Sequence, residues 1–363
     1  MRAPAWLDER VLTEKGKRGG EMKAWVWKGK DDIRLESGYP EPVAKPGWVV
    51  LKVRAAGICS TDVSIIRGRF GAWNPPGVLC HEICGEVVEL GEGAKGVKTG
   101  DRVVVETSVG CGICVKCRTG NKHLCQEAGE IGFPPFDGGY AEYVAVPDNC
   151  CRKMPESMSD AQGAILEASI CPFGRVYRTP PPMCATVLVQ GVGVAGLSFI
   201  QSVKCFGARK VIAAGRNLSR LADARHFGAD VVVNTREQDL AEVVRAETGG
   251  LGVDVSIDAA GAPATFDNAI SLCAAGGVVH LYGLPAGGAR MSLPTDDVIF
   301  RQLTIRGGTN NELAWVPLME LIAGGRFNNA DMVTHRFGFD ELPAAVETVD
   351  RHPDGLIKAV LLP

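Results

Sequence analysis

A glycine-rich string, Gly-Val-Gly-Val-Ala-Gly at residues 191–196, is the feature that most restricts the fold of this chain. The apolar run ATVLVQ before it reads as a buried strand, and AGLSFIQSVKCFGA at its end has a helical pattern. A G-x-G-x-x-G string between a strand and a helix is typical of a dinucleotide-binding turn. Gly191 then permits the tight bend, Gly193 lets a pyrophosphate approach, and Gly196 lets helix and strand pack closely. Five of its residues are candidate cofactor contacts: Gly191, Gly193, Val194, Ala195 and Gly196.

The residues after this string continue to alternate between strand and helix. KVIAAG, VVV, VDVSIDAAG and GGVVHLYG read as strands, and SRLADARHFGA between the first two reads as a helix. Such alternation implies a parallel sheet with right-handed crossovers. We therefore predict an α/β fold with a Rossmann doubly wound domain over residues 166–309, its helix N-terminus facing the phosphates.

The first half of the chain has a different pattern. VVLKVRAAG, GEVVEL, DRVVVE and AEYVAVP are short β-type runs divided by glycine and proline, which predicts an antiparallel β-rich domain. The final LIKAVLLP reads as a strand that returns to it, so residues 22–165 and 310–363 are expected to form one domain. Two domains suit a chain of 363 residues. Residues 1–21 are interpreted as an extension, with Met22 as a second candidate start.

Composition excludes several classes of protein. The net charge of −3 gives no basic surplus for nucleic acid. Residues 179–203 carry no charge, but three prolines and three glycines interrupt them, so we predict no membrane span. The N-terminus lacks the apolar core of a signal peptide. The 13 cysteines include C-x-x-C spacings, which favour metal ligands in a reducing compartment, and a cytoplasmic location is expected.

Four of these cysteines form a compact motif: Cys111, Cys114, Cys117 and Cys125. Four thiolates within so short a segment can close a tetrahedral zinc site. Because all four positions would be filled, the site is interpreted as structural, in a lobe at about residues 108–126. Glycines 110, 112 and 120 supply the bends, and His123 is not needed as a ligand.

A second, more scattered set comprises Cys59, in the run GICSTD, and His81, in the run CHEICGEVVELG. They offer zinc one sulfur and one nitrogen ligand. A catalytic zinc needs a third protein ligand and an open position.

Along the chain, the run CHEICGEVVELG comes first, the four-cysteine lobe second and the G-x-G-x-x-G string third. With its motifs in this order, the chain resembles the zinc-containing medium-chain dehydrogenases over about residues 22–363. The resemblance implies a GroES-like β-rich catalytic domain, a Rossmann domain, and Cys59 and His81 as ligands of a catalytic zinc. Glu82 looks like the carboxylate that ligates the metal or lies just behind it. The remaining ligand stands 24 residues before Gly191 in the family, which points to Glu167; Cys171, one helical turn further along, is the alternative.

The resemblance also implies roles around the metal. Thr61 matches the hydroxyl that accepts the substrate proton, and Asp62 is expected to orient the zinc site by pairing with a cation. Lys358 matches the family's basic partner. Ser64 replaces a histidine that releases the proton in many members, and Cys80 replaces the glycine that usually precedes the histidine ligand.

The second strand of the α/β region bears on the cofactor. Where an acid usually binds the ribose 2′-hydroxyl of NAD, KVIAA is followed by Gly215 and Arg216. A guanidinium can pair with a 2′-phosphate, and Arg220 lies one helical turn on. We predict NADP, with NAD as the alternative.

Together these features predict a zinc-dependent oxidoreductase with two zinc ions per chain. The resemblance suggests a secondary alcohol or carbonyl of a polyol, sugar or amino alcohol as substrate, and a homotetramer or homodimer. Trp73, Phe70 and Phe136 could line the pocket or belong to the core. A zinc-independent quinone or double-bond reductase and a non-catalytic zinc-bound family member are the alternatives.

Overall fold

The computed structural model describes residues 20–71, 73–284, 290–309 and 311–363. The chain divides into two compact units. The first contains residues 1–168, 315–323 and 329–363, and the second contains residues 169–314 and 324–328. Residues 1–19 of the predicted N-terminal extension lie outside the described part of the chain.

The first unit is built mainly on antiparallel strands, with β17 and β18 as a parallel pair. Its larger sheet has the order β10-β6-β5-β3-β18-β17, with β9 also paired to β3. These strands are β3 (Trp48–Ile58), β5 (Ile83–Leu90), β6 (Arg102–Val105), β9 (Tyr143–Pro147), β10 (Cys151–Lys153), β17 (Val333–Gly338) and β18 (Lys358–Leu362). The predicted return of the C-terminal strand is confirmed, because β18 pairs with the end of β3 through Ala359↔Ile58.

A smaller sheet and short helices complete this unit. The sheet has the order β2-β1-β4, formed by β1 (Glu21–Gly29), β2 (Asp32–Pro40) and β4 (Gly77–Val78). A two-stranded pair, β7 (Ser108–Val109) and β8 (Gly129–Glu130), flanks the cysteine lobe. The helices are α2 (Ser60–Ile66), α3 (Val115–Arg118), α4 (Asp160–Ala164), α11 (Trp315–Ala323) and α12 (Leu342–Arg351).

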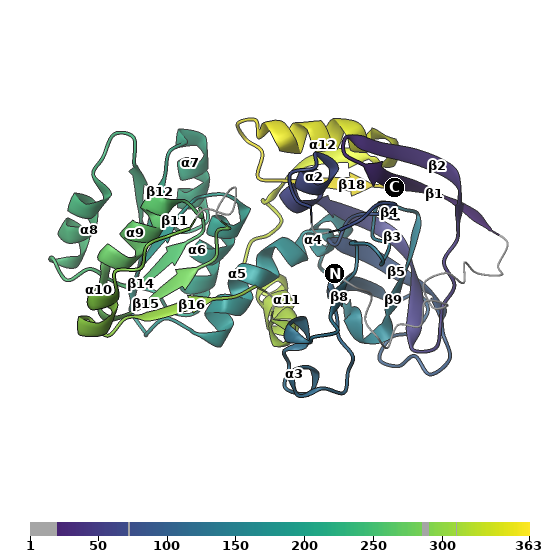
Figure 1. Cartoon of the computed structure of the whole chain (residues 1–363), viewed down its shortest axis with the longest axis horizontal. Helices are drawn as coiled ribbons and strands as arrows, with labels where there is room; N and C mark the ends of the chain where they lie inside the picture. The colour runs from purple at the N-terminus through teal and green to yellow at the C-terminus, as the bar shows by residue number, and fades with distance from the viewer. Residues whose placement is uncertain (1–19, 72, 285–289, 310) are drawn as a thin grey trace. The chain divides into compact units, whose positions relative to one another are not determined.

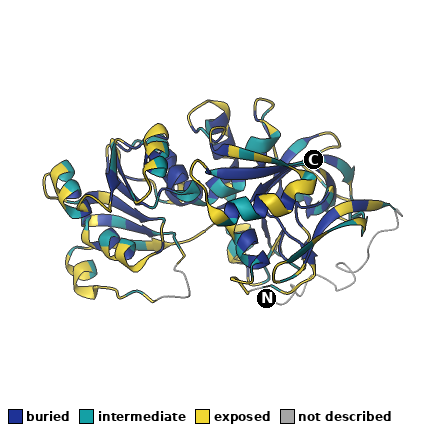
Figure 2. Ribbon diagram, turned by 90° about the horizontal axis from the view of Figure 1, so that it is seen from above, coloured by how far each residue is buried: buried dark blue, intermediate teal, exposed yellow. Residues whose placement is uncertain are grey.

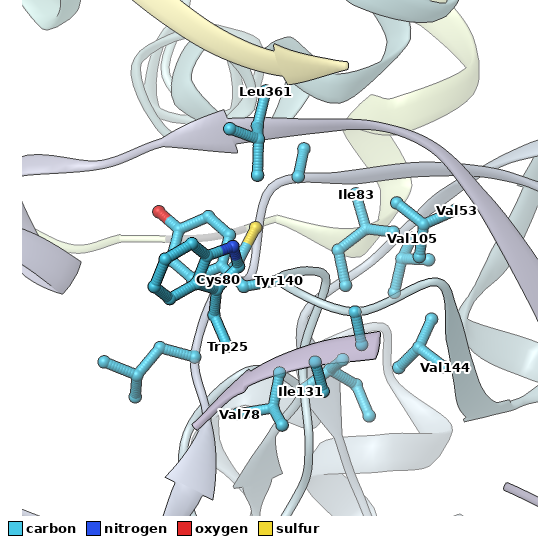
Figure 3. Packing of buried hydrophobic residues seen from close by; sticks show 14 of the residues in the cluster. Trp25, Val53, Val78, Cys80, Ile83, Val105, Ile131, Tyr140, Val144 and Leu361 are labelled. Atoms are coloured by element: carbon cyan, nitrogen blue, oxygen red, sulfur yellow. The ribbon is translucent and has the colours of Figure 1, made fainter. Parts of the chain in front are cut away.

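One buried hydrophobic cluster fills the first unit. Figure 3 shows part of it, with Cys80 lying in the same cluster as Trp25, Ile83 and Tyr140. The segment that carries His81 is therefore anchored at the core and does not belong to a surface loop.

The second unit is a six-stranded parallel sheet of order β13-β12-β11-β14-β15-β16 (Figure 1). Numbered from β11, this is the 3-2-1-4-5-6 order of the Rossmann fold. The strands are β11 (Thr186–Gln190), β12 (Lys210–Gly215), β13 (Val231–Asn234), β14 (Val253–Asp258), β15 (Cys273–Leu281) and β16 (Thr304–Gly307). All residues of β11 are buried, as expected for a parallel strand covered on both faces.

Helices alternate with these strands along the chain. They are α6 (Val194–Cys205), α7 (Leu218–His226), α8 (Leu240–Thr248), α9 (Pro263–Ser271) and α10 (Thr295–Phe300). Strands β11, β12 and β14 are largely buried, whereas β16 and the helices α7, α8 and α10 carry exposed residues, and Figure 2 shows such buried strands beside helices with exposed faces. Helix α5 (Leu166–Arg178) spans the boundary between the units. The described residues contain no helix long and apolar enough to cross a membrane.

Candidate functional site

Three potential metal ligands converge in the first unit. Cys59 caps the N-terminus of α2, and His81 and Glu82 lie just before β5. A ligand atom from each lies within 4.8 Å of those of the other two. His81 and Glu82 are buried and Cys59 is half-buried. The sulfur donor of Cys59 is thus brought to the nitrogen and oxygen donors of the adjacent residues His81 and Glu82.

Glu82 is held by a buried cation. The ammonium of Lys358 donates to Glu82 Oε1 and, at 3.0 Å, to the carbonyl of Ile58. The Glu82 Oε2 atom is buried and accepts no hydrogen bond. It packs so closely on Gly57 that a Cβ added there would lie 1.9 Å away. Burial alone would lower the pKa of Lys358, but the negative charges of Glu82 and then Cys59 outweigh burial and raise this pKa above its usual value. The ammonium therefore stays charged.

Asp62 orients His81 and does not contact Lys358. His81 Nδ1 lies 3.3 Å from Asp62 Oδ1, while Asp62 Oδ2 accepts from the Tyr140 hydroxyl at 3.1 Å and the Cys59 N–H at 3.3 Å. Lys358, expected as the family's basic partner, instead binds Glu82, and the group that Asp62 faces is His81. Burial lowers the pKa of His81, but Asp62 and Cys59 outweigh burial and raise it well above its usual value. The same negative field attracts a metal ion.

Glu167 reaches this cluster from the first turn of α5. Its Oε2 lies 3.8 Å from His81 Nε2, on the side of the ring opposite Asp62. Burial, more than any neighbour, raises the pKa of Glu167 to about 7. Cys171 follows on the same helix within the second unit, and the choice between these two residues stays a prediction.

Aromatic rings cover one face of His81. Phe133 stacks on the imidazole with centroids 4.8 Å apart, and Trp73 stacks on Phe133 at 4.4 Å. Phe70, at 5.5 Å from Trp73, extends this row to the surface. Phe136 instead stacks on Trp48 at 6.1 Å and is buried in the core. Phe133 was missed in the sequence, because no spacing links it to His81.

The other residues expected around the metal lie close by in the chain. Thr61 and Ser64 are half-buried on α2, two and five residues after Cys59. Cys80 is fully buried with φ of +89°, a conformation in which glycine would be unstrained. Its thiol lies 3.4 Å from the carbonyls of Gly57 and Glu82, so it can donate to either and hold the ligand segment in place.

The four cysteines of the lobe also converge. Their sulfur atoms all lie within 4.8 Å of one another. Gly110 packs against them, since a Cβ there would lie 2.7 Å from Cys117 Sγ, and Gly112 adopts φ of +75°. Backbone N–H groups of Ile113 and Cys114 lower the pKa of Cys111 to about 7, which favours the thiolate.

A buried ion-pair network lies beneath the lobe. Lys122, between Cys117 and Cys125, places its Nζ 3.2 Å from Glu106 Oε2 and 3.6 Å from Cys150 Sγ. Arg152 of β10 also binds Glu106. Glu106 has no exposed surface, so the two cations fasten the lobe to the sheet.

The glycine string in the second unit adopts the conformation expected for a nucleotide turn. Gly191 has φ of +95°, and Gly193 caps α6. A Cβ at Gly196 would lie 1.9 Å from the carbonyl oxygen of Gly191, so only glycine permits this packing. Val194 and Ala195 form the first turn of α6, whose amides point toward the turn.

The end of β12 leaves no room for an acidic side chain. A Cβ at Gly215 would meet Val192 Cγ2 at 2.6 Å. Arg216 follows and is exposed. The Arg220 guanidinium reaches the turn, with its Nη1 lying 3.8 Å from a Cβ placed on Gly193. Two cations therefore flank a nucleotide turn without an acid at residue 215.

Comparison with known proteins identifies the family. Residues 45–156 match the alcohol dehydrogenase GroES-like domain, and residues 193–324 match the zinc-binding dehydrogenase domain. L-threonine 3-dehydrogenase of Pyrococcus horikoshii is 34% identical over 336 residues, covering 90% of this chain and 94% of that protein. The chain belongs to the zinc-binding dehydrogenases. Sorbitol dehydrogenase of Bacillus subtilis is 29% identical over 345 residues, covering 94% and 97%.

The crystal structure of a zinc-binding dehydrogenase from Sinorhizobium meliloti 1021 bound to NADP is similar throughout. Its TM-score is 0.87 at 30% identity, covering 95% of this chain and all of that one. The predicted fold class, a GroES-like domain with a Rossmann domain, is confirmed. The chain itself is therefore an oxidoreductase of the alcohol dehydrogenase type that acts on CH–OH groups.

Proposed function

We propose that this dehydrogenase transfers a hydride between NADP(H) and a secondary alcohol or carbonyl of a polar substrate, with a catalytic zinc at Cys59 and His81. The observation that carries the proposal is the convergence of Cys59, His81 and Glu82 within 4.8 Å, with Asp62 and Lys358 holding two of them.

The donor set fits a zinc ion. Thiolate, imidazole and carboxylate are its usual ligands, and the unpartnered Oε2 of buried Glu82 is a further sign that a cation completes the cluster. Cys59 and His81 would hold the metal with Glu82 or Glu167 as a further ligand. Bound there, zinc would supply Lewis-acid polarisation of the substrate oxygen.

The remaining residues position these ligands and move the proton. Asp62 Oδ1 lies 3.3 Å from His81 Nδ1 and orients the ring so that Nε2 would be the ligating atom. Thr61 would accept the substrate hydroxyl proton while it donates its own proton onward, and Ser64, three residues further along α2, would pass that proton toward water. Hydride chemistry belongs to the nicotinamide, which the Rossmann unit positions.

A second, structural zinc is proposed in the cysteine lobe, for a total of two ions per chain. The four sulfur atoms lie close enough to share one metal, and they leave no ligand position for substrate. Thiol ligand sets also favour a reducing compartment such as the cytoplasm.

NADP is proposed over NAD because of the residues at the end of β12. The 2′-phosphate would meet Arg216 and Arg220, and Val192 fills the space in which an acid at residue 215 would stand. The dehydrogenase from Sinorhizobium meliloti bound to NADP is consistent with this choice.

The names of the relatives support a polar substrate with a secondary hydroxyl. Threonine and sorbitol dehydrogenases are named for such molecules. Glu167, near His81 Nε2, adds an oxygen donor to the cluster. A homotetramer or homodimer is also proposed from the family resemblance, and Ile299 and Phe300, which are 67% and 84% exposed in the helix before the edge strand β16, are apolar surface that such an assembly could cover.

The test is an initial-rate panel of polyols, sugars, amino alcohols and simple secondary alcohols. Each is run with NADP⁺ and NAD⁺, before and after chelation. Chelator-sensitive turnover of one polar class with NADP⁺ is expected. Higher rates with NAD⁺ than with NADP⁺ would refute the NADP preference that we infer from Gly215 and Arg216. Chelator-insensitive reduction of quinones would favour a zinc-independent reductase, and bound zinc without turnover would favour a non-catalytic member.

A further inference from the structure

The second unit contains a cluster of basic side chains with no carboxylate partner. Arg175 and Arg178 lie in the last turn of α5, and His280 and Arg306 are paired residues of the parallel strands β15 and β16. Arg175 Nη2 lies 3.5 Å from His280 Nδ1. No acidic side chain of the described residues lies within ion-pair distance of the three arginines.

Arg175 and His280 form the buried floor of this cluster. Arg175 is 8% exposed and His280 is 2% exposed. The Arg175 Nε is buried and makes no hydrogen bond. Burial, then Arg178 and Arg306, lower the pKa of Arg175, and burial, then Arg175 and Arg306, lower the pKa of His280 to about 4. His280 is thus neutral near pH 7, while the arginines repel one another.

Arg178 and Arg306 form an exposed rim. Arg306 Nη1 donates to Thr179 Oγ1 at 2.9 Å, and Arg178 Nη2 lies 3.5 Å from Asn311 Oδ1. Both partners are neutral. Arg175 Nη1 reaches the exposed backbone of Gly308, where an added Cβ would lie 2.3 Å from it. The buried guanidinium therefore approaches the surface at the end of β16.

Burying a cation without a counter-ion costs folding free energy. The loss of hydration of the cation is compensated only when an opposite charge binds it through hydrogen bonds. The α5 C-terminus contributes about half a negative charge, which is less than one guanidinium needs. His280 and Arg306 are the penultimate residues of their strands, and ligands of open α/β sheets bind at this carboxyl edge.

We propose that Arg175, His280 and Arg306 form a binding site for an oxyanion, a carboxylate or a phosphate. The Arg175 guanidinium binds it from the floor, Arg306 binds it from the rim, and His280 donates from its neutral ring. These residues are neither the proposed zinc ligands nor the residues proposed to bind the 2′-phosphate, so the site goes beyond the proposed function.

The experiment measures thermal unfolding with increasing sodium phosphate or sodium acetate, against sodium chloride of equal ionic strength. Every protein carries Arg216→Met and Arg220→Met, so phosphate at the proposed cofactor site does not contribute. In this background, Arg175→Met and Arg306→Met are compared with Arg245→Met, a control on exposed Arg245 of α8. Arg306 is exposed, so its variant tests the site even if Arg175→Met folds poorly.

The melting temperature is expected to rise with the oxyanion beyond the chloride effect in the background protein and in Arg245→Met. Anion affinity should fall about tenfold or more in Arg175→Met and Arg306→Met, as expected for a lost charge-assisted hydrogen bond. A response to phosphate alone identifies a phosphate-bearing ligand, and a response to acetate as well includes carboxylates. No oxyanion-specific rise, or a rise that survives both substitutions, overturns the site. So does dissociation of an oligomer in Arg306→Met without any anion effect, because a second copy would then supply the counter-ion.

Discussion

Replacing Lys122 with methionine should loosen the four-cysteine lobe while leaving its cysteines in place. Methionine keeps the aliphatic stem of Lys122 but removes the cation that lies 3.2 Å from Glu106 Oε2. Breaking a buried ion pair by removing one partner costs about 3–5 kcal/mol. Arg152 still binds Glu106 in the variant, so we expect the lower end, about 3 kcal/mol.

Hydrogen exchange measures this loss directly. At 1.4 kcal/mol per tenfold change, opening of the lobe should become roughly 100-fold more favourable. The protection of amides in residues 108–126 of the zinc-loaded protein should fall by that factor, while peptides of the second unit keep their protection. Lys116→Met, at an exposed lysine of the same lobe, is the matched control. Equal protection in Lys122→Met and the wild type would show that the ion pair does not hold the lobe.

Three further predictions concern the catalytic cluster, the cofactor and pH. Thr61→Val should lower turnover by about 100-fold or more with zinc content unchanged, as for a lost proton-transfer group, and near-normal turnover would exclude that role. Gly215→Asp should lower kcat/KM for NADP⁺ roughly 100-fold by like-charge repulsion. It should gain activity with NAD⁺ only when Val192→Ala makes room, so a gain in the single variant would contradict the steric argument. The pKa of His280 is lowered to about 4 by burial, then by Arg175 and Arg306, whereas an unfolded histidine titrates near 6.5. The unfolded state then binds more protons between these values, so a stabilisation of up to about 3 kcal/mol is complete above pH 6.5 and is lost as the pH falls toward 4. His280→Gln should flatten this dependence in chemical unfolding, and an unchanged slope would assign it to other groups.

Local motifs account for what could be predicted from the sequence. The four cysteines lie within 15 residues, and a chain that short has few ways to separate its thiols. The turn at Gly191 follows from its neighbours because a strand and a helix flank it directly. Helix α8 also had a readable start, since Asp239 accepts from the amides of Ala241 and Glu242, but this cap was not recognised in the sequence.

Contacts between distant segments could not be predicted in the same way. Lys358 and Glu82 are 276 residues apart, and only the pairing of β18 with β3 brings them together. Family resemblance identified Lys358 as a basic partner but did not indicate that Glu82 is the carboxylate it binds. Tyr140, which binds Asp62 across 78 residues, carries no spacing signal. One indirect clue to the position of Tyr140 is the nearby Gly138. A Cβ at Gly138 would lie 2.1 Å from the carbonyl oxygen of Cys80, so glycine is required where this segment packs on the segment that carries His81.

The two units contain opposite electrostatic imbalances, and the same rule applies to both. In the first, Asp62, Glu82 and Glu167 lie around His81, and the buried ammonium of Lys358 binds one of them, Glu82. In the second, Arg175 is buried, and the charged groups that act on it, Arg178 and Arg306, are cations. A chain that folds stably must neutralise such groups or change their protonation. The first cluster can do so with a metal ion. An arginine cannot release its proton near neutral pH, so the second needs an anion from outside the described residues.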